Sequence, residues 1–348
     1  MKRALRHVSQ LVPALLSLAL LAWVLRTADL RRALDLVRSQ GAWLPLLVLP
    51  NLLAVLCEAA GLWMCFERIG PRPRFRGLVT TRIVGDALML GLPSGAVLSE
   101  TALPYLLKRY CGVPTESGVV ATVARKFFVI LSHGLFLALA TFAAWPLLER
   151  GSNAAIGRVG LPLLLLAAAA VLVVTAFLLV TATTMGQIAD RLRRGLARFV
   201  GRWMGAWLER NALRFRRTDD ALAAFFSQRP AGLVVPLLLY TAGWLIRSLE
   251  TLWFLHLVGV EAPLSAAMVI ETTLILVRAL AVPVPAGLGV QDVGYVLSLK
   301  ALGVPHATTV GTALVILKRT KDLFWILAGF LLLSIGKRSN TSLIPQAS

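Results

Sequence analysis

Long apolar runs alternate with short basic stretches along this chain, and they constrain its fold more than any other feature. The run Leu161–Thr181 contains no charged residue and reaches the length of about 20 residues that a helix needs to cross a bilayer. Hydrophobic residues make up 57% of the 348-residue chain, and its mean hydropathy is +0.76. A soluble domain would not have this composition, so the sequence predicts an all-α polytopic membrane protein.

The formal net charge of +19 comes mainly from basic residues at the ends of the apolar runs. This pattern argues against nucleic-acid binding, which gathers cations on a folded soluble face. It is typical of orientation by the positive-inside rule and of contact with anionic headgroups. The three cysteines and four histidines show no metal or redox spacing, so we expect no cofactor, no bound metal and no disulfide framework.

We expect about six full transmembrane helices, with both termini in the cytoplasm. The expected spans are approximately residues 10–25, 42–66, 118–147, 161–181, 232–258 and 308–335. The first run resembles a signal peptide but lacks a convincing small-x-small cleavage site before Arg26, so we expect it to be retained. After it, Leu30, Leu34 and Val37 fall at helical spacing and predict an amphipathic helix on the outer surface of the membrane.

Two passages rich in proline and glycine interrupt the apolar pattern, Leu92–Glu100 (LPSGAVLSE) and Pro283–Asp292 (PVPAGLGVQD). A continuous helix cannot run through them, and in a bilayer such backbone survives where it is buried in protein or lines a polar cavity. The first passage interrupts residues 78–107, and the second separates two half-length segments, 263–281 and 288–302. We therefore predict two re-entrant or broken helix hairpins that approach the midplane from opposite faces.

The two breaks also suggest an internal repeat within a single membrane domain, 1–348, with halves at 42–147 and 231–336. Corresponding features are offset by 190 to 193 residues: Pro93-Ser94-Gly95 with Pro285-Ala286-Gly287, Glu100 with Asp292, Gly112-Val113-Pro114 with Gly303-Val304-Pro305, Arg125-Lys126 with Lys318-Arg319, Glu58 with Glu250, and Trp63 with Trp253. The expected span directions make the halves inverted. Inverted repeats with discontinuous helices are the architecture of many secondary transporters.

Residues 187–229 form the one sizeable polar segment, with ten arginines and four acidic residues. Apolar side chains recur in it at spacings of three and four and include Trp203 and Trp207. Such a basic amphipathic helix is expected to lie along the anionic lipids of the cytoplasmic leaflet. The alternative is a solvated connector with a charged face.

Ionisable residues within or beside the apolar segments are the candidate functional groups, because each is costly to expose to lipid. They are Glu58, Asp86, Glu100, Arg125, Lys126, Arg247, Glu250, Glu271, Arg278, Asp292, Lys318, Arg319 and Asp322. The strongest candidates for substrate binding lie at or near the breaks: Glu100, Arg278, Gly289, Gln291, Asp292 and Arg319. Asp86, Arg125, Glu271 and Lys318 are expected to support them through ion pairs.

The hypothesis for this site gives its groups two roles. Arg278 and the free amides after Gly289 hold an anionic headgroup, while Glu100 and Asp292 take up protons or pair with cations. Asp86 and Arg278 occupy equivalent positions with opposite charges and are candidates to pair with each other. In the alternative, structural interpretation, Arg247 with Glu250 and Lys318 with Asp322 close local helical pairs.

The second break resembles a known family. The stretch from Glu271 through PVPAGLGVQD to Lys318-Arg319 resembles the C-terminal half of the lysylphosphatidylglycerol synthase membrane-region family, also called flippase-like, and is most similar to its hopanoid-biosynthesis-associated branch. That branch has a Glu, an Arg seven residues later, a Pro-x-x-Gly-Gln-Glu break and a downstream basic pair. The earlier stretch GDALMLGLPSGAVLSE resembles the family's other signature. The resemblance covers roughly residues 41–336.

Two departures from the family pattern affect the candidate site. Asp292 stands where the family usually has Glu, which keeps the charge and shortens its reach. Leu98-Ser99-Glu100, with Leu103 three residues on, stands where the family has Gly-Gly-Glu and an Arg.

The resemblance implies lipid handling, specifically a flippase-like transporter of an anionic or isoprenoid, hopanoid-type lipid in a bacterial inner membrane. One alternative is a membrane glycosyl or lipid transferase acting on a polyprenyl carrier. It would need clustered carboxylates to hold a divalent cation, and no such cluster appears in the sequence, so we expect no enzymatic activity. The other alternative is a non-transporting scaffold for lipid-biosynthesis enzymes, which would be its partners.

Overall fold

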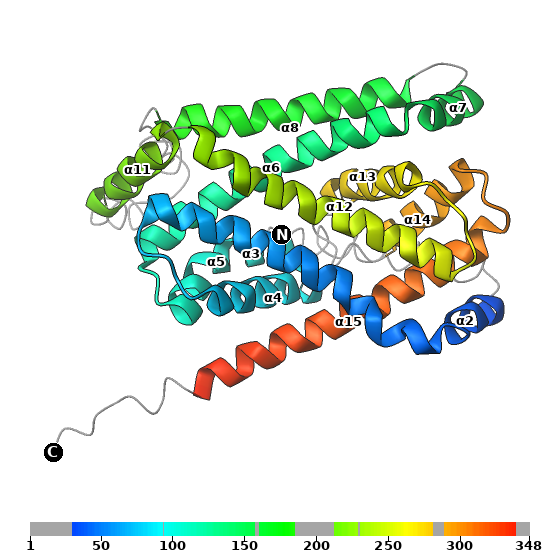
Figure 1. Ribbon diagram of the computed structural model, residues 1–348, viewed down its shortest axis with the longest axis horizontal. Coiled ribbons are helices and arrows are strands. Elements are labelled where there is room, and N and C mark those ends of the chain that lie inside the picture. Colours follow the sequence, from blue (N-terminus) through cyan, green and yellow to red (C-terminus); the bar gives the residue numbers. More distant parts are fainter. Residues whose placement is uncertain are drawn as a thin grey trace, which may run out of the picture.

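The computed structural model describes residues 30–92, 94–156, 160–184, 212–228, 230–280 and 289–338. Every regular element in these ranges is a helix (Figure 1), which confirms the all-α prediction. Four helical stretches in them are long and apolar enough to cross a membrane: Pro45–Ile69, Thr115–Ala143, Leu161–Thr181 and Ala231–Leu257. The expected first span, 10–25, and the tryptophan-bearing part of the basic segment lie outside the described residues.

The elements follow the chain in this order. They are α2 (Leu30–Arg38), η1 (Gly41–Val48), α3 (Leu49–Ile69), α4 (Phe75–Gly91), α5 (Gly95–Cys111), α6 (Thr115–Ala143), α7 (Trp145–Ile156), α8 (Leu161–Thr184), α11 (Ala212–Ser227), η2 (Pro230–Leu233), α12 (Val234–Leu257), α13 (Leu264–Leu280), α14 (Val290–Ala301) and α15 (Ala307–Arg338).

Helices α3 and α12 form an antiparallel pair across the middle of the molecule (Figure 1). Gly61 lies against Tyr240 near one end of the pair, and Trp43, just before α3, meets Trp253 near the other. Helices α6 and α8 lie side by side along one edge, and α15 runs along the opposite edge (Figure 1). The α4–α5 helix pair and the α13–α14 helix pair lie toward opposite ends of the α3–α12 pair (Figure 1).

The first predicted break is a tight helical hairpin. Helix α4 ends at Gly91, Ser94 adopts the left-handed conformation with φ 54°, and α5 begins at Gly95. Each helix has 17 residues, which spans about 25 Å at 1.5 Å per residue and falls short of a hydrocarbon core of about 30 Å. The second break separates α13 from α14, and residues 281–288 lie outside the described ranges.

The two Gly-Val-Pro stretches end their helices in the same way. Gly112 follows α5 with φ 69°, and Gly303 follows α14 with φ 71°. Glycine adopts this left-handed backbone without steric cost, and a proline soon afterwards prevents the helix from continuing. In each case a new long helix, α6 or α15, begins within a few residues.

One expected span differs from the structure in its end, and another differs in its charge. The expected span 118–147 is wrong at its end, because α6 stops at Ala143 and α7 starts at Trp145. Pro146 lies in the first turn of α7, where a helix tolerates the missing amide hydrogen. The expected sixth span coincides with α15, which is long enough to span but carries four charged residues near its middle, Lys318, Arg319, Lys321 and Asp322.

The two amphipathic segments also pack against the bundle. Helix α2 forms where its apolar spacing predicts it, and Ala33 and Val37 are buried next to α15, whereas Leu34 is 39% exposed. In the described part of the basic segment, α11 buries Leu222 and Phe225 against α6 and α8. The packed face of α2 is thus rotated from the one that the spacing of Leu30, Leu34 and Val37 suggested.

We expect Gly329→Ala to loosen the contact between α15 and α4. A methyl group at this position would lie 2.3 Å from the Cβ of Ala87 and 2.8 Å from the carbonyl oxygen of Ile83. The helices must move apart, at a cost of about 1–3 kcal/mol in the free energy of unfolding. Thermal unfolding in detergent, followed by tryptophan fluorescence, measures the effect. Gly243→Ala on α12, whose nearest neighbours are 3.8 Å away, is the control and should leave the midpoint nearly unchanged.

Candidate functional site

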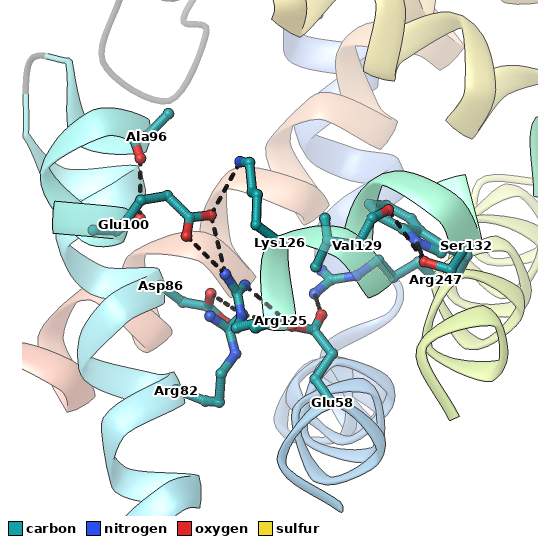
Figure 2. A network of polar contacts seen from close by, with 12 residues as sticks. Glu58, Arg82, Asp86, Ala96, Glu100, Arg125, Lys126, Val129, Ser132 and Arg247 are labelled. Atoms are coloured by element: carbon teal, nitrogen blue, oxygen red, sulfur yellow. Dashed lines mark hydrogen bonds and ion pairs between the residues drawn. The ribbon is translucent and has the colours of Figure 1, made fainter. Parts of the chain in front are cut away.

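Most of the buried charged residues of the described helices gather into two ion-pair networks. One joins α3, α4, α5, α6 and Arg247 of α12, and the other joins α12, α13, α14 and α15. Charged groups within apolar helices must pair or face a wet cavity, because lipid offers them no partner. The first network is drawn in Figure 2.

Glu58 on α3 is the centre of the first network. Its carboxylate lies 2.8 Å from Arg82, 3.1 Å from Arg247 and 3.6 Å from Arg125, which come from three different helices (Figure 2). Arg247 also donates a hydrogen bond to the side-chain oxygen of Asn51 at 3.2 Å. Glu58 therefore ties α3 to α4, α6 and α12 through one buried carboxylate.

Two further carboxylates complete this network. Asp86 accepts a hydrogen bond from Arg82 at 2.7 Å, one turn away on α4. Glu100 on α5 accepts from Arg125 at 3.0 and 3.1 Å, and from Lys126 at 3.3 Å. Arg125 thus bridges Glu58 and Glu100, and it links the α4–α5 hairpin to the central helices.

Lys318 on α15 is the centre of the second network. Its ammonium group donates to Glu250 at 2.7 Å and to the hydroxyl of Thr251 at 2.7 Å, and it lies 3.3 Å from Glu271. The Thr251 hydroxyl donates in turn to Glu271. Lys321 donates to the same oxygen of Glu250 at 2.8 Å, so two lysines and two carboxylates neutralise one another inside the bundle.

Asp292 closes the second network at the start of α14. One carboxylate oxygen accepts the backbone N–H of Gly289 at 2.9 Å, and the other accepts from Arg319 at 2.6 Å. A carboxylate in the first helical turn satisfies an otherwise free amide and interacts favourably with the helix dipole. Asp292 is 1% exposed and accepts the amide of Gly289 itself, so headgroup binding by the amides after Gly289 stays a prediction.

The two networks pair corresponding residues. The carboxylate after each break, Glu100 or Asp292, binds a basic residue on the following long helix, Lys126 or Arg319. The carboxylate of the central helix, Glu58 or Glu250, contacts the other member of each basic pair, Arg125 or Lys318. Residues offset by 192 or 193 positions therefore make equivalent contacts, which supports the interpretation as a repeat.

A small polar cavity lies within the second network. It is lined by Arg247, Glu250, Glu271, Gln291, Tyr295, Lys318, Arg319, Lys321 and Asp322. Its volume of about 30 Å³ has room for about one or two water molecules. Because it is far smaller than a lipid headgroup, this conformation would have to open before a lipid could enter.

The structure places most of the predicted site residues in these networks and changes some of their partners. The local pairs Arg247–Glu250 and Lys318–Asp322 are wrong: Arg247 reaches α3, and Lys318 binds Glu250 and Glu271. Long side chains allow these contacts across the helix interface. Arg278 lies on α13, but its side chain is outside the described part, so its pairing with Asp86 remains a prediction.

Sequence reasoning missed four participating residues, Arg82, Lys321, Thr251 and Asn51. Arg82 had a usable signal, since an arginine four residues before an aspartate is a favourable helical pair. Lys321 lies beside three other charged residues on α15. Thr251 and Asn51 gave no local signal, because their roles depend on helices that are distant in the sequence.

Comparisons with known proteins address the identity of this helical assembly. Searches of curated proteins and of solved structures gave no significant match. The family model described as "Lysylphosphatidylglycerol synthase TM region" matches residues 10–318, which is most of the chain. Together with the apolar helices, this match indicates a multi-pass membrane protein with a lipid-related function. The chain therefore belongs to the lysylphosphatidylglycerol synthase transmembrane-region family.

Proposed function

We propose that this protein is a flippase-like transporter that moves a lipid between the leaflets of a bacterial inner membrane, rather than an enzyme. The lipid is of the anionic or isoprenoid, hopanoid type. Both termini face the cytoplasm, and the two helix hairpins enter from opposite faces. The transported headgroup passes through the polar interior between them, while the lipid tails remain in the bilayer.

The observation that carries this proposal is the pair of matching ion-pair networks. Each hairpin contributes a carboxylate, Glu100 or Asp292, that is held by a basic residue on the neighbouring long helix. A buried ion pair contributes little to stability when compared with apolar packing, so networks inside apolar helices favour a functional role. Inverted repeats commonly alternate access by moving one unit against the other about a central site.

In the proposed cycle the ion pairs exchange partners. Asp292 is bound by Arg319 and by the Gly289 amide in the described conformation, and Glu100 is bound by Arg125 and Lys126. An entering anionic headgroup competes with these carboxylates for their cations, and each released carboxylate takes up a proton or another cation. Gln291 and Glu271 line the cavity where this exchange takes place on the α14 side.

We expect Asp292→Asn and Arg319→Gln to slow lipid translocation at least tenfold, the factor that corresponds to about 1.4 kcal/mol of lost charge pairing. The measurement uses proteoliposomes with fluorescent phosphatidylglycerol or a labelled isoprenoid lipid, and an impermeant quencher that reports the outer leaflet. The control variant is Glu261→Gln, an exposed residue in the loop between α12 and α13.

Two results would overturn this assignment. Normal translocation by both variants would remove the ion pair at Asp292 from the mechanism. A wild-type protein that moves neither class of lipid would reject the transporter itself and would favour a transferase or scaffold role.

A further inference from the structure

We propose that Arg247 is a switch that moves between the two ion-pair networks. In the described conformation its guanidinium group binds Glu58 on α3 at 3.1 Å rather than Glu250. In a second conformation it binds the carboxylate of Glu250, three residues further along α12. The inference rests on the proposed function and deepens it, because it names the contact that changes when the transporter passes from one conformation to the other.

The first argument is an unused acceptor close to Arg247. Lys318 and Lys321 both donate to Oε1 of Glu250. The other carboxylate oxygen of Glu250, Oε2, is buried and accepts no hydrogen bond among the described residues. Arg247 lines the same small cavity as Glu250. Buried acceptors are normally satisfied, and residues three positions apart on a helix are neighbours, so Oε2 is an acceptor within reach of Arg247.

The second argument is that Glu58 has other partners when Arg247 leaves. Arg82 and Arg125 lie 2.8 and 3.6 Å from Oε2 of Glu58, whereas Arg247 binds Oε1. The side chains of Arg82 and Arg125 are 7% and 9% exposed, and that of Arg247 is 21% exposed. Breaking a buried ion pair is most costly when it leaves a charge without compensation. Because Glu58 keeps two arginines, Arg247 is the cation that this network releases most easily.

The third argument is a missing counterpart in the predicted repeat. Glu58 and Glu250 are offset by 192 residues, and the residue at the same offset from Arg247 is Val55, which is buried. Valine carries no charge, so Val55 gives Glu250 no equivalent of the contact between Arg247 and Glu58. One arginine is therefore available to two equivalent carboxylates. When one unit of an inverted repeat moves against the other, the halves exchange roles, and Glu250 takes the place of Glu58.

The move of Arg247 changes which helices are tied together. Figure 2 shows its side chain extending toward Glu58, and with its hydrogen bond to Asn51 it links α12 to α3. When Arg247 binds Glu250, the contact lies within α12 and this link is lost. The first network still holds α3, α4, α5 and α6 together through Glu58 and Arg125. The switch thus releases the first half of the molecule from the second.

The test measures the distance between the two halves, separately from translocation. Spin labels replace Tyr105 on α5 and Leu297 on α14, which are 60% and 52% exposed and are also offset by 192 residues. The labels are introduced as unnatural amino acids, so the native cysteines stay in place. Pulsed electron–electron resonance on the full chain in lipid nanodiscs gives the population of each distance. We expect two distances, one of which agrees with the described conformation.

Two variants shift these populations in opposite directions, which misfolding does not do. Glu58→Gln weakens the hold of α3 on Arg247, and we expect the ratio of the second distance to the first to rise about threefold or more. Glu250→Gln removes the charge that attracts Arg247, and we expect the same ratio to fall about threefold or more. Both effects should disappear in an Arg247→Gln background, because the shared cation is absent. Glu261→Gln, in an exposed loop, is the control.

Each outcome decides between interpretations. A single distance in all variants, or shifts in the same direction, overturns the switch and leaves Oε2 of Glu250 to a bound water molecule. Opposite shifts that persist in the Arg247→Gln background overturn it as well, because another group then carries them. If the shifts are opposite and depend on Arg247 but no lipid is translocated, the switch stands and the transporter proposal fails. If translocation occurs without such shifts, the reverse holds.

Discussion

Replacement of Lys318 by methionine is expected to lower the free energy of unfolding by about 3–5 kcal/mol, the cost of removing one partner from a buried ion pair. Lys318 contacts Glu250, Thr251 and Glu271, and its side chain is 8% exposed. Methionine fills a similar volume but leaves two carboxylates with one fewer cation. Chemical denaturation in detergent, with a helix-sensitive probe, measures the loss.

The matched control is Lys126→Met in the corresponding basic pair. The Lys126 side chain is 47% exposed and forms an ion pair with Glu100, so we expect a loss of less than about 1 kcal/mol. Lys318→Arg keeps the charge and should recover part of the stability. If Lys318→Met and Lys126→Met cost the same, the second network does not contribute to stability in the way its burial suggests.

Gly95→Ala is expected to cost about 3 kcal/mol or more, because it obstructs the turn between α4 and α5. A methyl group on Gly95 would lie 2.3 Å from the carbonyl oxygen of Met89 and 2.4 Å from that of Leu88. Both atoms belong to the backbone, so rotation of a side chain cannot relieve the contact. The hairpin must open, and Glu100 on α5 then moves away from Arg125. We expect a lower unfolding midpoint together with loss of lipid translocation.

Gly85→Ala on α4 serves as the control for this substitution. Its nearest neighbour beyond the local backbone is the end of the Arg82 side chain at 3.7 Å, so the methyl group fits. Because alanine favours a helix over glycine by about 1 kcal/mol, Gly85→Ala should leave stability unchanged or raise it. A Gly95→Ala variant as stable as Gly85→Ala would show that the hairpin turn adapts more easily than its geometry indicates.

The sequence was sufficient to predict most of the described helices and the position of the first break. Apolar runs and proline–glycine passages act locally, so α8 was predicted from Leu161 onward and the hairpin turn near Ser94 was expected from LPSG. The end of α6 was predicted too late, since a run of apolar residues continues past Ala143 and only Pro146 marks the change. The six membrane spans and the inverted repeat remain predictions.

Candidate site residues were easier to predict than their partners. A charged side chain within an apolar run is visible in the sequence, and Glu58, Glu250 and Asp292 all proved to be buried and paired. Which charges meet depends on how α3, α12 and α15 pack, and that information is distributed over the whole chain. The contact of Arg247 with Glu58, 189 residues away, could not be read from helical spacing.

Arg247 takes part in both ion-pair networks. It binds Glu58 in the first network at 3.1 Å, and it also lines the cavity of the second network beside Glu250 and Lys318. A ligand that draws Arg247 toward one side changes the charge that the other side experiences. Thermodynamic linkage makes such an effect reciprocal, with the same factor in both directions. One arginine shared by two ion-pair networks therefore gives the molecule a means of making the charge state of one network depend on that of the other.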